Sequence, residues 1–348
     1  MKWFLLLFCI FGHAQKNDTW FPFYNQDSTL MGYKDKNNII KINPKFEPYF
    51  VSRKFDNVMA VMEVTKEGWK DYYLTKSGKQ FGIDSTYTFD MTFDCENEGF
   101  IRFQDAKTTE NTGLFDLNGN IIIPAKYNQL SKVVNGTLVA LKVAKKKYDG
   151  EHFWWIDGQE ILIDTKNNIL IENFKDSYPL NFYSMKISDK PILDSIRENY
   201  LGTNGKYYSF INEEKEFRAW FKNIFLKNPT KQNIIQYTFH TLSIWRNNER
   251  ELVRNKVYID ENFKQINKII NYILKLKNEY SVSKKDLDFL LDDDEFEIYE
   301  DFYDNCSQSK DWIYPKLDVI IKYKNRDHYL SFLKTKEGYK LIDFNTNE

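Results

Sequence analysis

From residue 28 to residue 210, short runs of alternating apolar and polar side chains follow one another, and each run ends at turn-forming residues. A period of two places successive side chains on opposite faces of a strand, and β-branched and aromatic residues fill these runs. Clear examples occupy residues 57–64, 99–103 and 136–143. The pattern therefore predicts short antiparallel strands joined by hairpins.

One hairpin sequence occurs twice. Residues 113–128 read GLFDLNGNIIIPAKYN, and residues 32–47, which lie 81 positions earlier, read GYKDKNNIIKINPKFE. Similarity at a fixed spacing indicates a structural repeat, and copies centred on Ser77-Gly78, Asn167-Asn168 and Asn204-Gly205 extend the series to five units of roughly forty residues. The two best copies are identical at Gly32/Gly113, Asp35/Asp116, Asn37/Asn118, Ile40/Ile121, Ile42/Ile123 and Lys45/Lys126.

The turn residues should set the register of each unit. A two-residue hairpin turn that matches strand twist requires positive φ at both central positions, and Asn and Gly tolerate this best. We therefore expect such turns at Asn37-Asn38, at Asn118-Gly119 and at the equivalent pairs. Because one hairpin buries too little surface to be stable alone, the units are expected to stack or pair.

After about residue 211 the apolar spacing changes to that of helices. Asn212 precedes a first turn rich in acids, and Asp260 precedes a second apolar stripe, so each is expected to cap a helix. Ser283 and Asp286 form a plausible capping box for a third helix. The expected helices span 212–227, 260–277 and 284–303, and the ambiguous stretch 230–246 is also assigned to helix.

Three strands are expected at the end of the chain, within residues 317–344. The predicted fold class is α+β multidomain, with an N-terminal antiparallel β-hairpin repeat array followed by a smaller α+β domain that ends in a three-stranded antiparallel meander. The array is assigned to residues 28–210 and the α+β domain to residues 211–348.

The repeat pattern resembles the WG repeat of bacterial exported and cytoplasmic proteins. The resemblance rests on Gly or Trp with an aromatic residue, then Asp-x-x-Gly, Ile-Ile-Ile-Pro and Lys-Tyr, and residues 113–143 match it best. It covers about residues 28–210, although the unit at 32–64 has Asn38 in place of the turn glycine. The resemblance implies a β-rich scaffold that binds or displays and supplies no catalytic residues. The C-terminal part is similar, at the level of fold alone, to cystatin-like and NTF2-like domains, which by itself implies no activity.

The first fifteen residues, MKWFLLLFCIFGHAQ, carry one lysine and then an apolar run that ends in small residues. This pattern predicts a signal peptide over residues 1–14, followed by a lead-in over 15–27, and hence export to the periplasm or the medium. No later apolar run reaches the ~18 residues of a membrane helix. The mature chain keeps Cys95 and Cys306, which could form one disulfide in an oxidising compartment. Because they fall in different predicted domains, two buried free thiols are the favoured alternative.

Charge and motifs restrict the chemistry. The chain has 49 Lys and Arg against 50 Asp and Glu, so it lacks the basic excess of a nucleic-acid-binding protein. No HExxH, CxxC, GxSxG or glycine-rich phosphate loop occurs, so we predict no metal site, no cofactor and no catalytic residues. The acidic run at 291–305 lacks calcium-loop spacing and is interpreted as the solvated face of a helix. Lys145, Lys146 and Lys147 are assigned to a solvated loop.

The sequence HFWWIDG at residues 152–158 contains the candidate binding residues. Trp154 and Trp155 are adjacent, so on a strand they point to opposite faces, and one could stack on a sugar ring or anchor a partner protein. The favoured alternative is that both are buried between stacked hairpins. The expected function is non-catalytic binding or display at the bacterial envelope, with a protein or glycan partner. The alternative is a hydrolase-like enzyme with its site in the C-terminal domain or in the cleft between the two domains.

Overall fold

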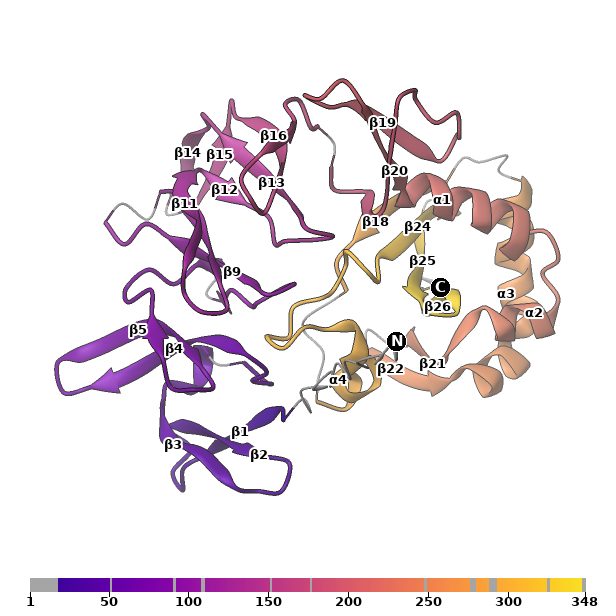
Figure 1. The fold of residues 1–348 in the computed structure, drawn as a ribbon. Coiled ribbons are helices and arrows are strands. Elements are labelled where there is room, and N and C mark those ends of the chain that lie inside the picture. The colour runs from indigo at the N-terminus through magenta and orange to yellow at the C-terminus, as the bar shows by residue number, and fades with distance from the viewer. Residues whose placement is uncertain are drawn as a thin grey trace, which may run out of the picture.

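A computed structural model shows an α+β protein with a β-rich N-terminal part. Figure 1 shows the β units following one another around an arc, with the helical C-terminal domain beside the last of them. The predicted signal peptide, residues 1–14, lies outside the described residues. The structure describes residues 18–50, 52–89, 92–107, 110–150, 152–175, 177–246, 249–275, 280–287, 293–323 and 326–345.

Five three-stranded antiparallel units form the arc. The first contains β1 (Trp20–Tyr24), β2 (Met31–Asp35) and β3 (Ile40–Phe46), and the second β4 (Val58–Thr65), β5 (Gly68–Thr75) and β6 (Gln80–Phe81). The third contains β9 (Phe100–Gln104), β10 (Thr112–Asp116) and β11 (Ile121–Tyr127), and the fourth β13 (Thr137–Lys142), β16 (Gln159–Asp164) and β17 (Ile169–Ile171). The fifth contains β18 (Leu180–Ser188), β19 (Arg197–Leu201) and β20 (Tyr207–Asn212), in the spatial order β18-β20-β19. Shorter elements are η1 (Pro48–Phe50), β7 (Thr88–Phe89), β8 (Thr92–Phe93) and β12 (Gln129–Leu130).

The units are nearly separate sheets. Strands of units one and two share one sheet, but β3 and β4 pair only through Phe46 and Glu63. The first unit also includes β1, which lies within the segment that the sequence analysis set apart as a lead-in and pairs along its length with β2. Stability of the array must therefore come mainly from packing between units rather than from a continuous hydrogen-bonded sheet.

That packing follows from the alternation of side chains along the central strands. In β5, Tyr72 belongs to the apolar layer between units one and two, whereas Tyr73 belongs to the layer between units two and three. In β10, Phe115 faces unit two and Leu114 faces unit four, and Leu162 of β16 faces unit five. All five side chains are at most 6% exposed. The central strands β5, β10 and β16 are thus buried on both faces, with odd and even positions in different layers.

The turn type differs from the prediction. In the turn between β2 and β3 only Asn38 has positive φ (63°), and the Asp35 carboxylate accepts hydrogen bonds from the backbone N–H groups of Asn37 (2.8 Å) and Ile39 (3.0 Å). The register between β2 and β3 also shifts next to the turn, between Tyr33 and Lys34, and again between Met31 and Tyr33. A single left-handed residue after a type I turn, with a bulge, replaces the expected pair of left-handed residues.

The aspartate of the repeat is therefore the residue that fixes the turn. Asp116 accepts the equivalent hydrogen bonds from Asn118 and Asn120, and Asp164 accepts them from Lys166 and Asn168. In the fourth unit, Asn167 has positive φ (65°). It is the first residue of the predicted Asn167-Asn168 pair.

The glycine that recurs at Gly32 and Gly113 is required for a reason other than the turn. A Cβ atom on Gly32 would lie 2.3 Å from the Ile42 carbonyl oxygen, and one on Gly113 would lie 2.7 Å from that of Ile123. These are the same contact in two units, because 32 and 42 correspond to 113 and 123. Glycine is required where the two strands approach this closely.

The C-terminal domain is built on a six-stranded sheet in the order β22-β21-β26-β25-β24-β23. Its strands are β21 (Thr238–Arg246), β22 (Glu249–Arg254), β23 (Ser281–Lys285), β24 (Lys316–Tyr323), β25 (Arg326–Thr335) and β26 (Gly338–Asn345). Its helices are α1 (Glu213–Trp220), the π-helical turn η2 (Phe221–Phe225), α2 (Lys231–Gln236), α3 (Asn255–Lys275), α4 (Asp293–Tyr299) and η3 (Glu300–Phe302). The α1–α3 side chains cover one face, and α4 with η3 contributes to the core on the other.

The predicted three-stranded meander is β24-β25-β26, but the sheet is twice as wide. Asn212 caps α1 as expected, since its side chain accepts the Lys215 N–H at 3.1 Å. The helix expected over 260–277 is present as α3, which begins earlier, at Asn255, and α4 with η3 forms part of the helix expected over 284–303. The remaining assignments need correction. The stretch 230–246 is only partly helical and forms β21, Asp260 lies inside α3, and Ser283 lies in β23. Ser283 pairs with Asp318 of β24, so strand pairing across the sheet prevails over the local capping signal.

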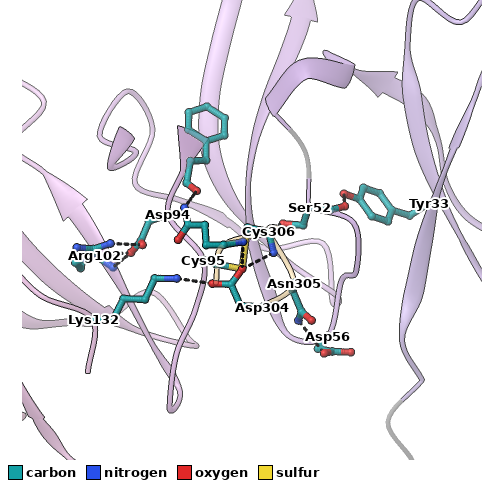
Figure 2. The surroundings of a disulfide bond; sticks show 12 residues. Tyr33, Ser52, Asp56, Asp94, Cys95, Arg102, Lys132, Asp304, Asn305 and Cys306 are labelled. Carbon is teal, nitrogen blue, oxygen red and sulfur yellow. Dashed lines mark hydrogen bonds and ion pairs between the residues drawn. A yellow bond between two sulfur atoms is a disulfide. The ribbon is translucent and has the colours of Figure 1, made fainter. Parts of the chain in front are cut away.

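Residues 303–312, here called the anchor loop, extend from the C-terminal domain to the inside of the arc (Figure 1). Figure 2 shows Asp304 between Lys132 and the backbone of the loop, with Asn305 facing Asp56. The Asp304 carboxylate lies 2.5 Å from the Lys132 ammonium, and Asn305 donates to the Asp56 carboxylate at 2.8 Å. Asp56 and Lys132 lie in connections of different units, so this one loop contacts the array at separate points.

The anchor loop also carries the disulfide. Cys306 is bonded to Cys95, with their Cα atoms 5.8 Å apart and 211 positions apart in sequence. The favoured alternative, two free thiols in separate domains, is therefore not what the structure has. The two cysteines meet because the anchor loop crosses from one domain to the other.

Replacing Cys306 with serine should lower the free energy of unfolding by about 2–4 kcal/mol, because the bond closes a very long loop of the unfolded chain. Thermal unfolding of Cys306→Ser and of the oxidised parent, each with and without reductant, measures the effect. Reductant should destabilise the parent and leave the variant unchanged. Equal unfolding temperatures for all four samples would contradict the proposed role of the bond.

Candidate functional site

A two-stranded hairpin protrudes from the fourth unit. Strands β14 (Lys145–Asp149) and β15 (His152–Ile156) pair with each other and form their own small sheet. Because β13 and β16 pair directly, with Lys142 opposite Gln159, this hairpin is an insertion between two neighbouring strands. The Lys145–Lys147 triplet is thus on a strand, and its assignment to a solvated loop was wrong.

The hairpin carries aromatic side chains on both faces. Trp154 is 45% exposed, and Phe153 is 46% exposed, whereas Trp155 is half-buried with its ring 5.6 Å from that of Phe153. The ammonium group of Lys147 lies 5.4 Å from the Trp154 ring, and Lys146 lies 4.5 Å from the Phe153 ring. Neither tryptophan belongs to the core, so the alternative of two buried tryptophans is wrong. Adjacent residues on a strand point to opposite faces, so Trp154 and Trp155 lie on different faces of the hairpin, as predicted.

A broad cleft of about 1270 Å³ lies beside this hairpin. Residues of the third and fourth units line it, together with the connections on either side of them: Gln104 ends β9 and Thr112 begins β10, whereas Tyr87 precedes β7 and Asn173 follows β17. The lining includes Phe153, Trp154 and Trp155 together with five amide side chains, those of Gln104, Asn128, Gln129, Gln159 and Asn173. The cleft therefore combines aromatic faces with groups that both donate and accept hydrogen bonds.

The scaffold holds two of these amides in place. Asn128 accepts the backbone N–H of Ala144 at 2.9 Å through its Oδ1 atom, and Gln159 donates to the Glu172 carbonyl at 2.8 Å. Within the described chain, the Asn128 Nδ2 group has no protein acceptor. The site thus has polar groups whose orientation is fixed before any ligand arrives, as ligand pockets generally do.

A second concentration of polar groups lies where the last unit meets the C-terminal domain. The Lys284 ammonium, 3% exposed, is 3.0 Å from Glu213 and 3.3 Å from Asp311, and it donates to the Tyr178 carbonyl at 3.2 Å. Burial raises the pKa of Glu213 to about 7, although the Lys284 ammonium acts in the opposite direction. Burial also raises the pKa of Asp311. The fully buried Glu213 and the partly buried Asp311 share one ammonium, and the raised pKa of Glu213 leaves this carboxyl partly protonated near pH 7.

This cluster does not look like an active site. Glu213 is fully buried, and none of these residues lines either of the two cavities described for the chain. The smaller cavity, about 410 Å³, lies in the C-terminal domain and includes His240, Asp301 and Glu337. Among the groups with a shifted pKa, Tyr87 lines the larger cleft, and burial raises its pKa, whereas Glu213, Lys284 and Asp311 line neither cavity. The buried cluster and the two cavities are therefore in different places.

Cys95, Cys306 and Asp304 lie close enough together to suggest metal ligands. The disulfide uses both sulfur atoms, and Asp304 accepts the backbone N–H groups of Cys306 and Gln308. The donor set therefore does not suit a metal ion. The acidic run at 291–305 falls partly outside the described residues. In its described part, the acids of α4 and η3 are exposed (Glu297, Glu300 and Asp301) while Tyr299 and Phe302 are buried, as predicted for a solvated helix face, whereas Asp304 lies in the anchor loop.

No protein-family model, curated protein or solved structure matches this chain. The resemblance to WG repeats consequently rests on the sequence motifs alone. Among the helices that the structure describes, none has both the length and the apolar character needed to cross a bilayer.

Sequence reasoning identified Trp154 and Trp155 on a strand, but neither the partner strand β14 nor the rest of the cleft. Trp154 and Trp155 stood out because two adjacent tryptophans on a strand cannot both face one layer. The five amides come from separate segments between residues 104 and 173, and no spacing in the sequence links them. The insertion that interrupts the fourth repeat was the signal in the sequence that could have indicated an additional element beside the repeat.

The buried cluster predicts a specific pH dependence. The pKa of Glu213 in the folded protein, about 7, lies above its ordinary value of 4.5, so between these values the folded state keeps a proton that the unfolded chain releases. Stability should then fall as the pH rises through this window, by up to about 3 kcal/mol. Glu213→Gln should flatten this part of the profile in denaturant unfolding at pH 5, 6, 7 and 8. Parallel profiles for the two proteins would contradict the assignment.

Proposed function

We propose that this protein is a non-catalytic binding protein, exported to the bacterial envelope, which captures a protein or glycan partner in the cleft beside the β14–β15 hairpin. The observation that carries the proposal is an inserted hairpin with exposed aromatic rings next to a cleft with fixed polar groups. Exposed aromatic clusters of this kind typically mark interaction sites, because leaving them in water is unfavourable.

The scaffold supports this proposal. Side chains of the fourth unit, from which the hairpin extends, are packed between two neighbouring units, so the site is held on a buried framework. Binding sites on rigid elements lose less conformational entropy when a ligand binds. The resemblance to WG repeats agrees with a scaffold that binds or displays. Export is supported by the apolar run in residues 1–14 and by the disulfide, which suits an oxidising compartment.

Capture by the immobilised, oxidised chain of residues 15–348 tests the proposal. A specific protein or glycan from the envelope or culture fluid of the producing cell should be retained in near-stoichiometric amount. Trp154→Ala should weaken retention at least about tenfold, or ~1.4 kcal/mol, because the ring is a contact surface. Its unfolding temperature should change little, since the side chain lies outside the core.

Trp69→Ala is the matched control, because Trp69 is 63% exposed on β5 and does not line the cleft. This variant should retain the partner like the parent. Absence of any retained partner, or equal retention by Trp154→Ala and the parent, would contradict the proposal.

A further inference from the structure

We infer that the ligand of this cleft is a neutral oligosaccharide chain. The inference rests on the proposed binding function and adds the chemical class of the ligand. It is carried by the combination, in one cleft, of aromatic faces, five amide side chains and balanced charge.

The size of the cleft favours an extended ligand. Its volume, about 1270 Å³, exceeds the ~300–1,000 Å³ of ordinary small-molecule pockets. Its lining comes from the third and fourth units and from the connections that flank them, so a ligand in it can contact more than one unit. A chain of several sugar rings has the length to use such a surface, whereas a single metabolite does not.

The lining matches the two surfaces of a sugar ring. One face of a pyranose presents C–H groups, which pack on an aromatic ring, and its rim presents hydroxyl groups, which both donate and accept hydrogen bonds. Phe153 and Trp154 both line the cleft with exposed rings, and because they lie on opposite faces of β15 a given sugar ring would stack on one of them. Amide side chains supply a donor and an acceptor on one planar group, which is the pairing that a hydroxyl group requires. Thr112 adds a hydroxyl group to the same lining.

The charges of the cleft exclude a polyanion. The lining has two lysines, Lys146 and Lys175, and two carboxylates, Asp157 and Glu160. Lys146 is also close to the Glu110 carboxylate, at 3.8 Å, and to two aromatic rings. A site for nucleic acid or an acidic polysaccharide needs a continuous basic surface along the strand. In this cleft the charges of the two lysines and the two carboxylates cancel, so there is no net positive charge to attract such a ligand.

A protein partner would call for a different lining. The centre of a stable protein interface is a fully desolvated apolar or aromatic pocket, and polar groups form its rim. In this cleft, amides lie among the aromatic residues, and burying them under an apolar partner would leave their hydrogen bonds unmade. Hydroxyl-rich ligands avoid that cost.

Titration calorimetry with the oxidised chain of residues 15–348 provides the test. The ligands are neutral hexasaccharides of β-1,4-linked glucose, α-1,4-linked glucose, β-1,4-linked mannose and β-1,4-linked N-acetylglucosamine, with a hexamer of galacturonic acid as the anionic comparator. At least one neutral hexasaccharide should bind, and its affinity should be the same at low and high salt because no ionic contacts are screened. Trp154→Ala should weaken binding tenfold or more, and Trp69→Ala should leave it unchanged.

The outcomes separate the two proposals. If no neutral hexasaccharide binds but a protein partner is still captured in a Trp154-dependent way, the inferred ligand class is wrong and the binding function stands. Salt-sensitive binding of the galacturonic hexamer alone would likewise overturn the neutral class. If nothing binds and no partner is captured, both proposals fail. Equal binding of a neutral hexasaccharide by Trp154→Ala and the parent would place the sugar outside this cleft.

Discussion

The repeat array depends on one constraint, which is that its central strands are buried on both faces. Neighbouring residues such as Tyr72 and Tyr73 belong to different apolar layers, so no unit has a complete core of its own. Each unit is stable only between two others, as in other repeat proteins. The array must therefore end against something, and after β20 the chain passes directly into α1 of the C-terminal domain.

The anchor loop adds a second restraint from the inside of the arc (Figure 2). Its ion pair with Lys132, its hydrogen bond to Asp56 and its disulfide to Cys95 hold connections that belong to different units. Near this point, the Asp94 carboxylate is also buried and pairs with Arg102 at 2.6 Å. Although burial opposes ionisation, the guanidinium holds the pKa of Asp94 below its usual value. These contacts hold the connections on the inner side of the array. The β14–β15 insertion therefore extends from a fixed framework, which can tolerate its exposed aromatic rings.

The sequence predicted those features that depend on local pattern. Hairpin units, the Asn212 cap and the change from β to α+β near residue 211 all follow from periodicity and turn chemistry, and the structure has them. Features that depend on distant contacts were missed or misassigned. The turn type was misread because the Asp35 carboxylate, and not the Asn37-Asn38 pair, organises the turn. Strand β23 was misread as helix because pairing with β24 outweighs its capping signal. The cleft amides meet only after the units stack.

The central claim is that a ligand contacts the aromatic hairpin of the fourth unit. The indole N–H resonances of the tryptophans, followed in a ¹⁵N correlation spectrum during titration with the hexasaccharide that binds best, test it most directly. The account predicts that the signals of Trp154 and Trp155 shift, whereas those of Trp220, against the C-terminal core, and of Trp69 remain in place. Shifts confined to Trp69, Trp220 or other tryptophans away from the cleft would contradict it.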